Sequence, residues 1–236
     1  MRITIHQPEH MPWLGLLDKV QQVDLWVILD NVQFRRRYFQ NRNKIRTASG
    51  WGWLTVPVHS VWGKSLINDI TVDQDSDWQK RCWKTMRQNY ARAPYFEQHV
   101  SFFDSLYSRG WKFLVDLNCE IIQYLLACFE IDVELKLASD MACSGRSHEL
   151  ILSLCKEAGA SVYLSGVSGK DYLKMEDFQY EHIDLDFQEF YHPIYQQCYE
   201  PFIPYMSSVD LLFNYGIDVK RFIIGKDVDR LDYTLN

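Results

Sequence analysis

The 236-residue sequence lacks the short motifs that identify many enzymes directly. It contains no GxSxG, HExxH, GxGxxG or GxxxxGK[ST] pattern, and no hydrolase triad can be assigned from it. Each of these motifs places a nucleophile, a metal or a phosphate-binding loop at a defined position in a fold. The reaction must therefore be inferred from the arrangement of other residues.

The sequence also lacks the cysteine spacing of a disulfide framework or a zinc site. Its six cysteines form no CxxC pair, and most of them fall within apolar helical patterns. This distribution is typical of reduced thiols in a core. His6 and His10 flank a proline turn without an evident third ligand, so we predict no metal site.

Long apolar runs and an excess of positive charge are missing as well. No run approaches the length of a membrane span, and the first residues predict a strand rather than a charged and apolar leader. We therefore expect a cytoplasmic protein. Its formal net charge of −6 argues against a dedicated nucleic-acid-binding protein. The sequence predicts no oligomeric state.

The composition is sufficient for a large core. Hydrophobic residues make up 47% of the chain, and aromatic residues make up 15%. Such a chain can form one domain, which we place at residues 1–236. The aromatic content also suggests exposed rings in a cleft that binds flat or sugar-like ligands.

Residues 3–34 form the clearest local unit. Residues 3–5 are β-branched and predict a buried strand, which Pro8 ends because proline has no N–H group. Apolar residues at helical spacing predict a helix over residues 11–22, and the apolar run 23–30 predicts a strand covered on both faces. The unit is therefore a β-α-β crossover with parallel strands.

The remainder of the chain continues this alternation. Short strands are predicted at residues 133–138 and 161–166 and at the start of 182–197, and a helix is predicted at 148–158. Residues 75–130 have mainly helical patterns. We expect an α/β fold with a mostly parallel, Rossmann-like sheet, flanking helices, and a helical insertion or subdomain at 75–130.

Polar residues follow the predicted strands where each of them ends. In parallel α/β sheets, ligands bind in the crevice outside these carboxyl ends. His6, Gln7, Glu9 and His10 follow the first strand and are our catalytic candidates. A histidine there can transfer protons or contact a phosphate, and Glu9 is the best nearby carboxylate for a general base.

One basic segment, residues 35–46, stands out in this acidic protein. It carries six Arg and Lys residues interleaved with Tyr, Phe and Asn. Charged runs are most often solvated surface, but this run begins at a strand end and could instead bind an anion such as phosphate. Residues 51–60, which follow it, predict an edge strand that Pro57 interrupts or ends.

Two later segments offer further contacts. In SGVSGKD, residues 165–171, the glycines allow close approach of the backbone, and Lys170 supplies a cation; an ordinary turn is about equally compatible. Ser207 or Ser208 can cap a short helix, either at an anion site or simply as a cap.

Several segments resemble one known family over nearly the whole chain. QPEHMPWLGLLDKVQQVD, LDNVQFRRRYFQNRNKIR, WLTVPV, YLSGVSGKDYL, FYHPIYQQ and FIPYMSSVDLLFNYG are similar to the WbqC-like family. That family is associated with gene clusters for bacterial O-antigen and other surface polysaccharides. The resemblance implies a role in making or decorating an activated amino sugar. Members commonly have Tyr or a similar residue before PWLG, where this chain has His10 and Met11.

Together these patterns predict an enzyme that modifies a nucleotide-linked amino sugar by acyl or aminoacyl transfer to its amine. The cofactor is not predicted, and a nucleotide or an activated acyl donor would fit. The predicted substrate-binding residues are Trp13, Asp30, Gln33, Arg35, Asn41, Arg42, Lys44, Ser165, Gly166, Ser168, Lys170, Tyr172, His192, Tyr195, Gln196, Ser207, Ser208 and Asp210.

Two alternatives remain open. The layout of strand, histidine turn, helix and strand is similar to that of HIGH-type nucleotidyltransferases and adenylate-forming ligases, although this chain lacks their HxGH motif. That alternative predicts consumption of a nucleoside triphosphate. A non-catalytic subunit of a polysaccharide assembly complex is the other alternative.

Overall fold

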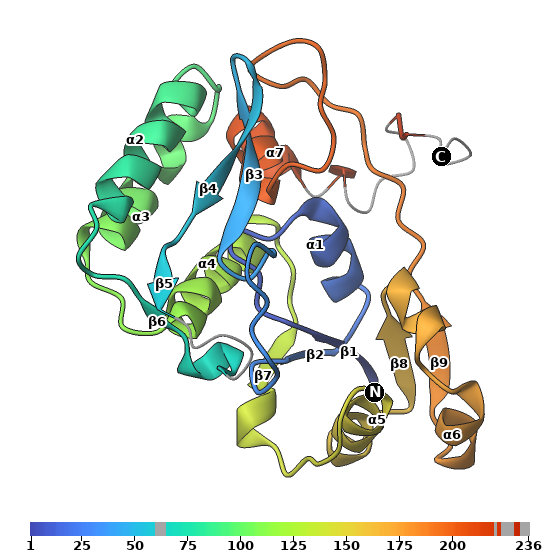
Figure 1. Cartoon of the computed structure of the whole chain (residues 1–236). Helices are drawn as coiled ribbons and strands as arrows, with labels where there is room; N and C mark the ends of the chain where they lie inside the picture. Colours follow the sequence, from blue (N-terminus) through green and yellow to red (C-terminus); the bar gives the residue numbers. More distant parts are fainter. Residues whose placement is uncertain (60–64, 220, 223–228, 232–236) are drawn as a thin grey trace.

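The computed structural model describes residues 1–59, 65–219, 221–222 and 229–231, and these residues form an α/β fold (Figure 1). Its central sheet has five strands, all parallel, in the order β7-β2-β1-β8-β9. Counted within this sheet alone, the order is 3-2-1-4-5, as in doubly wound Rossmann folds. The predicted fold class is confirmed. The strands are β1 (Arg2–His6), β2 (Leu25–Ile28), β7 (Glu134–Leu137), β8 (Val162–Ser165) and β9 (Asp184–Phe187).

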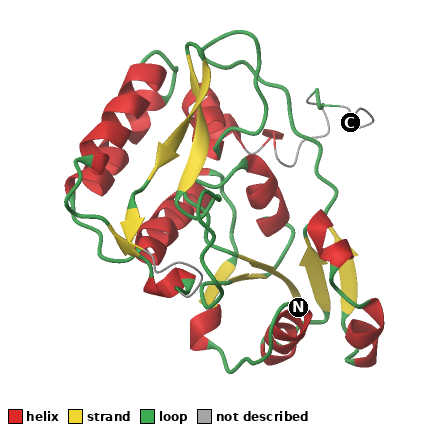
Figure 2. Ribbon diagram, in the orientation of Figure 1, coloured by secondary structure: helices red, strands yellow, loops and turns green. Residues whose placement is uncertain are grey.

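Helices cover both faces of the sheet (Figure 2). Trp26 and Ile28 of β2 face one apolar cluster, which includes residues of α1 (Leu14–Val20) and α4 (Leu114–Cys128). Val27, between them, belongs to a second cluster with residues of α5 (His148–Glu157) and α6 (Met175–Tyr180). This alternation follows from the two-residue period of a strand. It explains why β2 is apolar along its length.

The cluster on the α1 face extends well beyond the sheet. It joins α1 and α4 to a β-hairpin, to two further helices and to α7. The predicted helical segment 75–130 contains α2 (Trp78–Tyr90), α3 (Phe96–Ser108) and α4, and apolar residues of all three helices belong to this cluster. That this segment forms a subdomain stays a prediction. The bounds are α2 (Trp78–Tyr90), α3 (Phe96–Ser108), α5 (His148–Glu157), α6 (Met175–Tyr180), α7 (Ser208–Tyr215), β3 (Arg42–Thr47), β4 (Gly50–Thr55), β5 (Val58–His59), β6 (Thr71–Val72), and the 3-10 helices η1 (Ile67–Asp69), η2 (Ala138–Asp140), η3 (Val167–Asp171) and η4 (Gly216–Val219).

Two local predictions differ from the structure. The helix predicted from residue 11 begins at Leu14, because Met11 has a φ of 48° and Trp13 is extended with a ψ of 167°. The end of the basic segment is strand β3, paired with β4, although the sequence showed a strand only from residue 51. Charged and polar side chains conceal the β3 pattern, since Ile45 is its one aliphatic residue. None of the helices among the described residues is long and apolar enough to cross a bilayer.

Trp26, on the inner strand β2, offers a test of the fold. Its side chain is fully buried, and its Nε1 donates to the His6 carbonyl at 3.3 Å. We predict that Trp26→Ala lowers the free energy of unfolding by about 3–5 kcal/mol, since it leaves a large cavity. Denaturant titration measures the loss. The matched control, Trp51→Ala, removes a ring that is 45% exposed and should cost less than about 1 kcal/mol. Equal losses in the two variants would contradict this placement of the core.

Candidate active site

Two adjoining cavities lie beyond the carboxyl ends of β1 and β8. The larger cavity has a volume of about 760 Å³, and the smaller has a volume of about 490 Å³. Their walls share His6, Glu9, Tyr38 and Ser168. Since β2 and β8 lie on opposite sides of β1, this is the switch point of the sheet, where ligands bind in open α/β folds. The crevice therefore lies where the strand ends predicted it.

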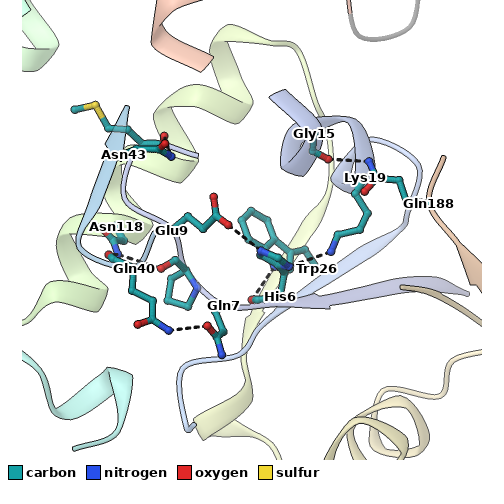
Figure 3. Close-up of polar contacts among 12 residues, drawn as sticks. His6, Gln7, Glu9, Gly15, Lys19, Trp26, Gln40, Asn43, Asn118 and Gln188 are labelled. Carbon is teal, nitrogen blue, oxygen red and sulfur yellow. Dashed lines mark hydrogen bonds and ion pairs between the residues drawn. The ribbon is translucent and has the colours of Figure 1, made fainter. Parts of the chain in front are cut away.

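Lys19, His6 and Glu9 contact one another in series, and His6 and Glu9 belong to the shared wall (Figure 3). Lys19 Nζ lies 3.1 Å from His6 Nδ1, and His6 Nε2 lies 3.1 Å from Glu9 Oε1. A lysine ammonium can only donate, so His6 Nδ1 accepts and Nε2 carries the proton that it donates to Glu9. The other carboxylate oxygen, Glu9 Oε2, is buried and has no hydrogen-bond partner in the described part of the chain.

Burial lowers the pKa values of two of these three side chains, Lys19 and His6. Burial lowers the pKa of Lys19 to about 8, although the Glu9 carboxylate opposes this change. The pKa of His6 is lowered by burial and by the nearby Lys19 charge, while Glu9 raises it. His6 is therefore neutral near pH 7, and Lys19 is mainly protonated. The arrangement places a carboxylate with one free oxygen against a neutral imidazole, which suits a general base.

The turn after β1 is held by amides from distant parts of the chain (Figure 3). Asn118 of α4 donates to the Pro8 carbonyl at 3.2 Å and to the Gln40 carbonyl at 2.8 Å. The Gln40 side chain donates to Gln7 Oε1 at 2.6 Å. These bonds satisfy polar groups that would otherwise be buried unpaired, and they fix the backbone around Glu9.

His10 belongs to the same group of hydrogen bonds that holds the turn after β1, and it lines neither cavity. Its Nδ1 is 3.2 Å from Asn118 Oδ1, and its side chain is fully buried. Burial lowers the pKa of His10 to about 4, so that the ring is neutral near pH 7. Its geometry suits positioning of the turn, and its predicted catalytic role stays a prediction.

Aromatic rings form one side of the larger cavity. Trp13 packs against Phe190 at 5.3 Å and against Tyr205 at 6.0 Å between ring centroids. The Trp13 ring folds over Gly15, where a Cβ atom would lie only 2.2 Å from it. The glycine of the PWLG sequence is therefore required for this ring position. The faces of such rings suit stacking on a nucleobase or a sugar.

Three lysines line the same cavity: Lys19, Lys44 and Lys170. Lys44 Nζ lies 4.6 Å from the Trp51 ring centroid, and Lys170 Nζ lies 5.3 Å from that of Phe187. Glu9 and Glu189 add negative charge to the wall. Lysine ammonium groups are suitable partners for phosphate oxygens.

The structure brings a little less than half of the predicted residues together, ten of 22. Those in the two cavity walls are His6, Gln7, Glu9, Trp13, Arg35, Lys44, Gly166, Ser168, Lys170 and Tyr172. Those outside both walls are His10, Asp30, Gln33, Asn41, Arg42, Ser165, His192, Tyr195, Gln196, Ser207, Ser208 and Asp210. The binding roles of this second set stay predictions.

Several residues of the second set have partners that explain them structurally. Asp30 accepts from Ser139 N at 2.9 Å and from Ser139 Oγ at 2.6 Å, while Asn41 donates to Val56 O at 2.8 Å. Arg42 stacks 3.9 Å from the Trp53 ring centroid. These contacts join the strand ends to neighbouring loops and to the hairpin.

Other residues of the second set belong to the C-terminal segment. His192 Nδ1 is 2.8 Å from Pro193 O, and its Nε2 accepts from Tyr205 N at 3.1 Å. The backbone N–H of Gln196 donates to Tyr215 Oη at 3.0 Å, and Ser207 accepts from Val209 N as the cap of α7. Three positions remain. Gln33 forms a β-bridge with Leu66, and the Ser165 hydroxyl donates to Gly166 O. The Ser208 side chain is buried.

Asp210 is the centre of a separate buried network on α7. It accepts hydrogen bonds from Tyr90 at 2.8 Å, Tyr195 at 2.9 Å and Gln197 at 2.7 Å. Arg46, the last charge of the basic segment, donates to Gln197 Oε1 at 3.2 Å and is 1% exposed. This network ties the hairpin to α7 and shows that Arg46 faces the interior of the protein.

Sequence reasoning missed Lys19, Gln40, Asn118 and Gln188. Lys19 and Asn118 fall in amphipathic helices, where a polar residue usually faces solvent. Gln188 donates to Gly15 O at 2.8 Å and to Asp18 Oδ2 at 2.6 Å, from just beyond β9. Its position directly after the end of β9 was the sequence signal that could have identified it. No local signal marked the other three, because their contacts with His6, Gln7 and Pro8 arise only in the folded chain.

Comparison with known proteins agrees with the segments noted in the sequence. A family model described as the WbqC-like protein family matches residues 7–222. The chain belongs to the WbqC-like protein family. This WbqC-like chain is also 29% identical over 226 residues to the uncharacterized protein Rv1507c of Mycobacterium tuberculosis (strain ATCC 25618 / H37Rv), covering 94% of this chain and 97% of that protein. No solved structure was found to match it.

The charge arrangement in this WbqC-like site can be tested by NMR. We predict that Lys19→Met raises the pKa of His6, because the ammonium disfavours a second positive charge while Glu9 favours it. The pKa is measured from the imidazole nitrogen shifts of His6 during a pH titration, with His6→Gln for assignment. Lys80→Met, at a lysine side chain that is 85% exposed, is the control and should leave it unchanged. An unchanged or lowered His6 pKa in Lys19→Met would contradict the arrangement.

Proposed function

We propose that this protein transfers an acyl group to the amine of a nucleotide-linked amino sugar. The observation that carries the proposal is the buried Oε2 of Glu9, which has no hydrogen-bond partner among the described residues and belongs to a residue that lines both cavities. A buried carboxylate oxygen without a partner is costly, and a bound amine would supply the missing hydrogen bond. The same oxygen can then accept a proton from that amine.

The transfer is a nucleophilic substitution at a carbonyl carbon. The sugar nitrogen forms a bond to the acyl carbon, and the bond between that carbon and the leaving group of an activated acyl donor breaks. Glu9 Oε2 takes the proton that the nitrogen loses. The leaving group departs with the bonding electron pair. His6, fixed by Lys19, keeps the carboxylate oriented throughout.

The larger cavity supports the nucleotide part of this proposal. It combines aromatic rings, which suit a base and a sugar, with lysines, which suit phosphates. Lys44 comes from β3, and Lys170 comes from η3, which follows β8. A role in surface polysaccharide (O-antigen) biosynthesis fits the family resemblance.

The reaction is tested by mass spectrometry of products from a panel of nucleotide amino sugars with activated acyl donors. We expect one combination to yield a mass gain equal to the acyl group. Glu9→Gln keeps the shape but removes the base, so its rate should fall by roughly 10²–10⁴-fold.

The matched control is Glu97→Gln on α3, an exposed carboxylate far from the sheet ends, which should retain the rate. No mass change for any combination would count against the proposal. An active Glu9→Gln variant would refute the role of Glu9.

Nucleotidyl transfer is the second candidate. The supporting observation is the histidine-containing turn after β1, at the switch point of a 3-2-1-4-5 parallel sheet, which agrees with the HIGH-type layout. This candidate requires release of pyrophosphate from a nucleoside triphosphate. It is tested by incubating the protein with nucleoside triphosphates and amino sugar phosphates, and nucleotidyl transfer is excluded if no triphosphate is consumed.

A further inference from the structure

The His6–Glu9 pair stands between two cavities of different chemistry. The larger cavity lies on the side of α1, since Gly15, Leu16 and Lys19 line it. The smaller cavity lies on the side of α5, since Leu150 and Ile151 line it. A reaction between two substrates needs both reacting groups at one base, and this arrangement lets each substrate enter its own cavity.

The wall of the smaller cavity is aliphatic at its inner side. Ile5 of β1, Leu29 and Val32 after β2, and Leu150 and Ile151 of α5 contribute to it. Ile5, Leu150 and Ile151 are each less than 10% exposed. Such a surface favours an apolar group, because burying aliphatic carbon atoms there removes them from water.

The polar residues that line this cavity differ in charge and in exposure. Arg35, Ser147 and Tyr172 line it and are exposed, so they suit a polar or anionic carrier near solvent. Glu9 is the one acidic residue among the described residues of the lining. The side chains of Gln7 and Gln40 are already joined to each other at 2.6 Å.

We propose, on the basis of the proposed function, that the smaller cavity binds the acyl group of the donor and that this group is a short aliphatic chain. An aminoacyl group would bring an ammonium into the cavity. Its only carboxylate partner there would be Glu9, which must stay free to accept the proton of the sugar amine. The lining therefore favours aliphatic acyl over aminoacyl transfer.

The proposal is tested with products, which occupy both cavities whatever the donor's leaving group. The probes are UDP-glucosamine and its N-acetyl, N-butanoyl and N-glycyl derivatives, with dissociation constants from calorimetry. We expect N-butanoyl to bind about 10-fold more tightly than N-glycyl, since aliphatic contacts in a fitted pocket discriminate on this scale. N-acetyl should bind with intermediate affinity.

Two substitutions of Leu150 change the size of the cavity in opposite directions. Leu150→Phe should reduce the preference for butanoyl over acetyl, and Leu150→Ala should retain or increase the preference for the longer chain. Leu152→Phe is the matched control on the same helix; Leu152 lines neither of the two cavities and should leave the preference unchanged. The affinities of the butanoyl and acetyl derivatives are compared within each variant. A general loss of stability would therefore not change the preference between them.

The outcomes separate this proposal from the proposed function. If UDP-glucosamine binds but N-butanoyl has no advantage over N-glycyl, or neither Leu150 variant alters the chain preference, the acyl-cavity proposal is overturned and the nucleotide site stands. If none of the four nucleotides binds the wild-type protein, both proposals are overturned. The expected ranking with the expected Leu150 effects supports both.

Discussion

The contact between Lys19 and His6 sets the chemistry of this site. With Lys19 protonated, His6 Nδ1 must accept, and its Nε2 proton must point to Glu9, 3.1 Å away. Burial lowers the pKa of Lys19 to about 8, so the contact persists in its charged form near neutral pH. One oxygen of Glu9 is thereby occupied, and the other is buried without a hydrogen-bond partner in the described part of the chain.

The fold serves to hold this chain of contacts in place. The parallel sheet brings β1 and β8 side by side, and the switch point between them opens the crevice. Asn118 of α4 and Gln40, which precedes β3, hold the turn after β1. The buried Arg46 and Asp210 networks support the hairpin and α7, which flank that turn. Rigid support of this kind is what a general base needs.

Much of the fold was predictable, because strand periodicity and Pro8 mark β1, and an apolar run marks β2. The crevice followed from the same patterns, since polar residues after parallel strands meet at one edge. The function of each charge in the basic segment was not predictable. Arg35 and Lys44 line the cavities while Arg46 is buried. Lys44 and Arg46 lie on the same face of β3, and Arg46 is buried because it donates to Gln197, Tyr199 and Pro201 of a distant segment. Lys19 contacts His6, 13 residues away, and Asn118 contacts Pro8 and Gln40, 110 and 78 residues away. These contacts depend on the fold, and local patterns do not contain that information.

The central claim is that an amine bound in the larger cavity meets the free oxygen of Glu9. A crystal structure of the protein with UDP-glucosamine tests it most directly. The account predicts the diphosphate near Lys44 and Lys170 and the amine nitrogen within hydrogen-bond distance of Glu9 Oε2. A nucleotide bound elsewhere, or an amine that points away from Glu9, would contradict the account.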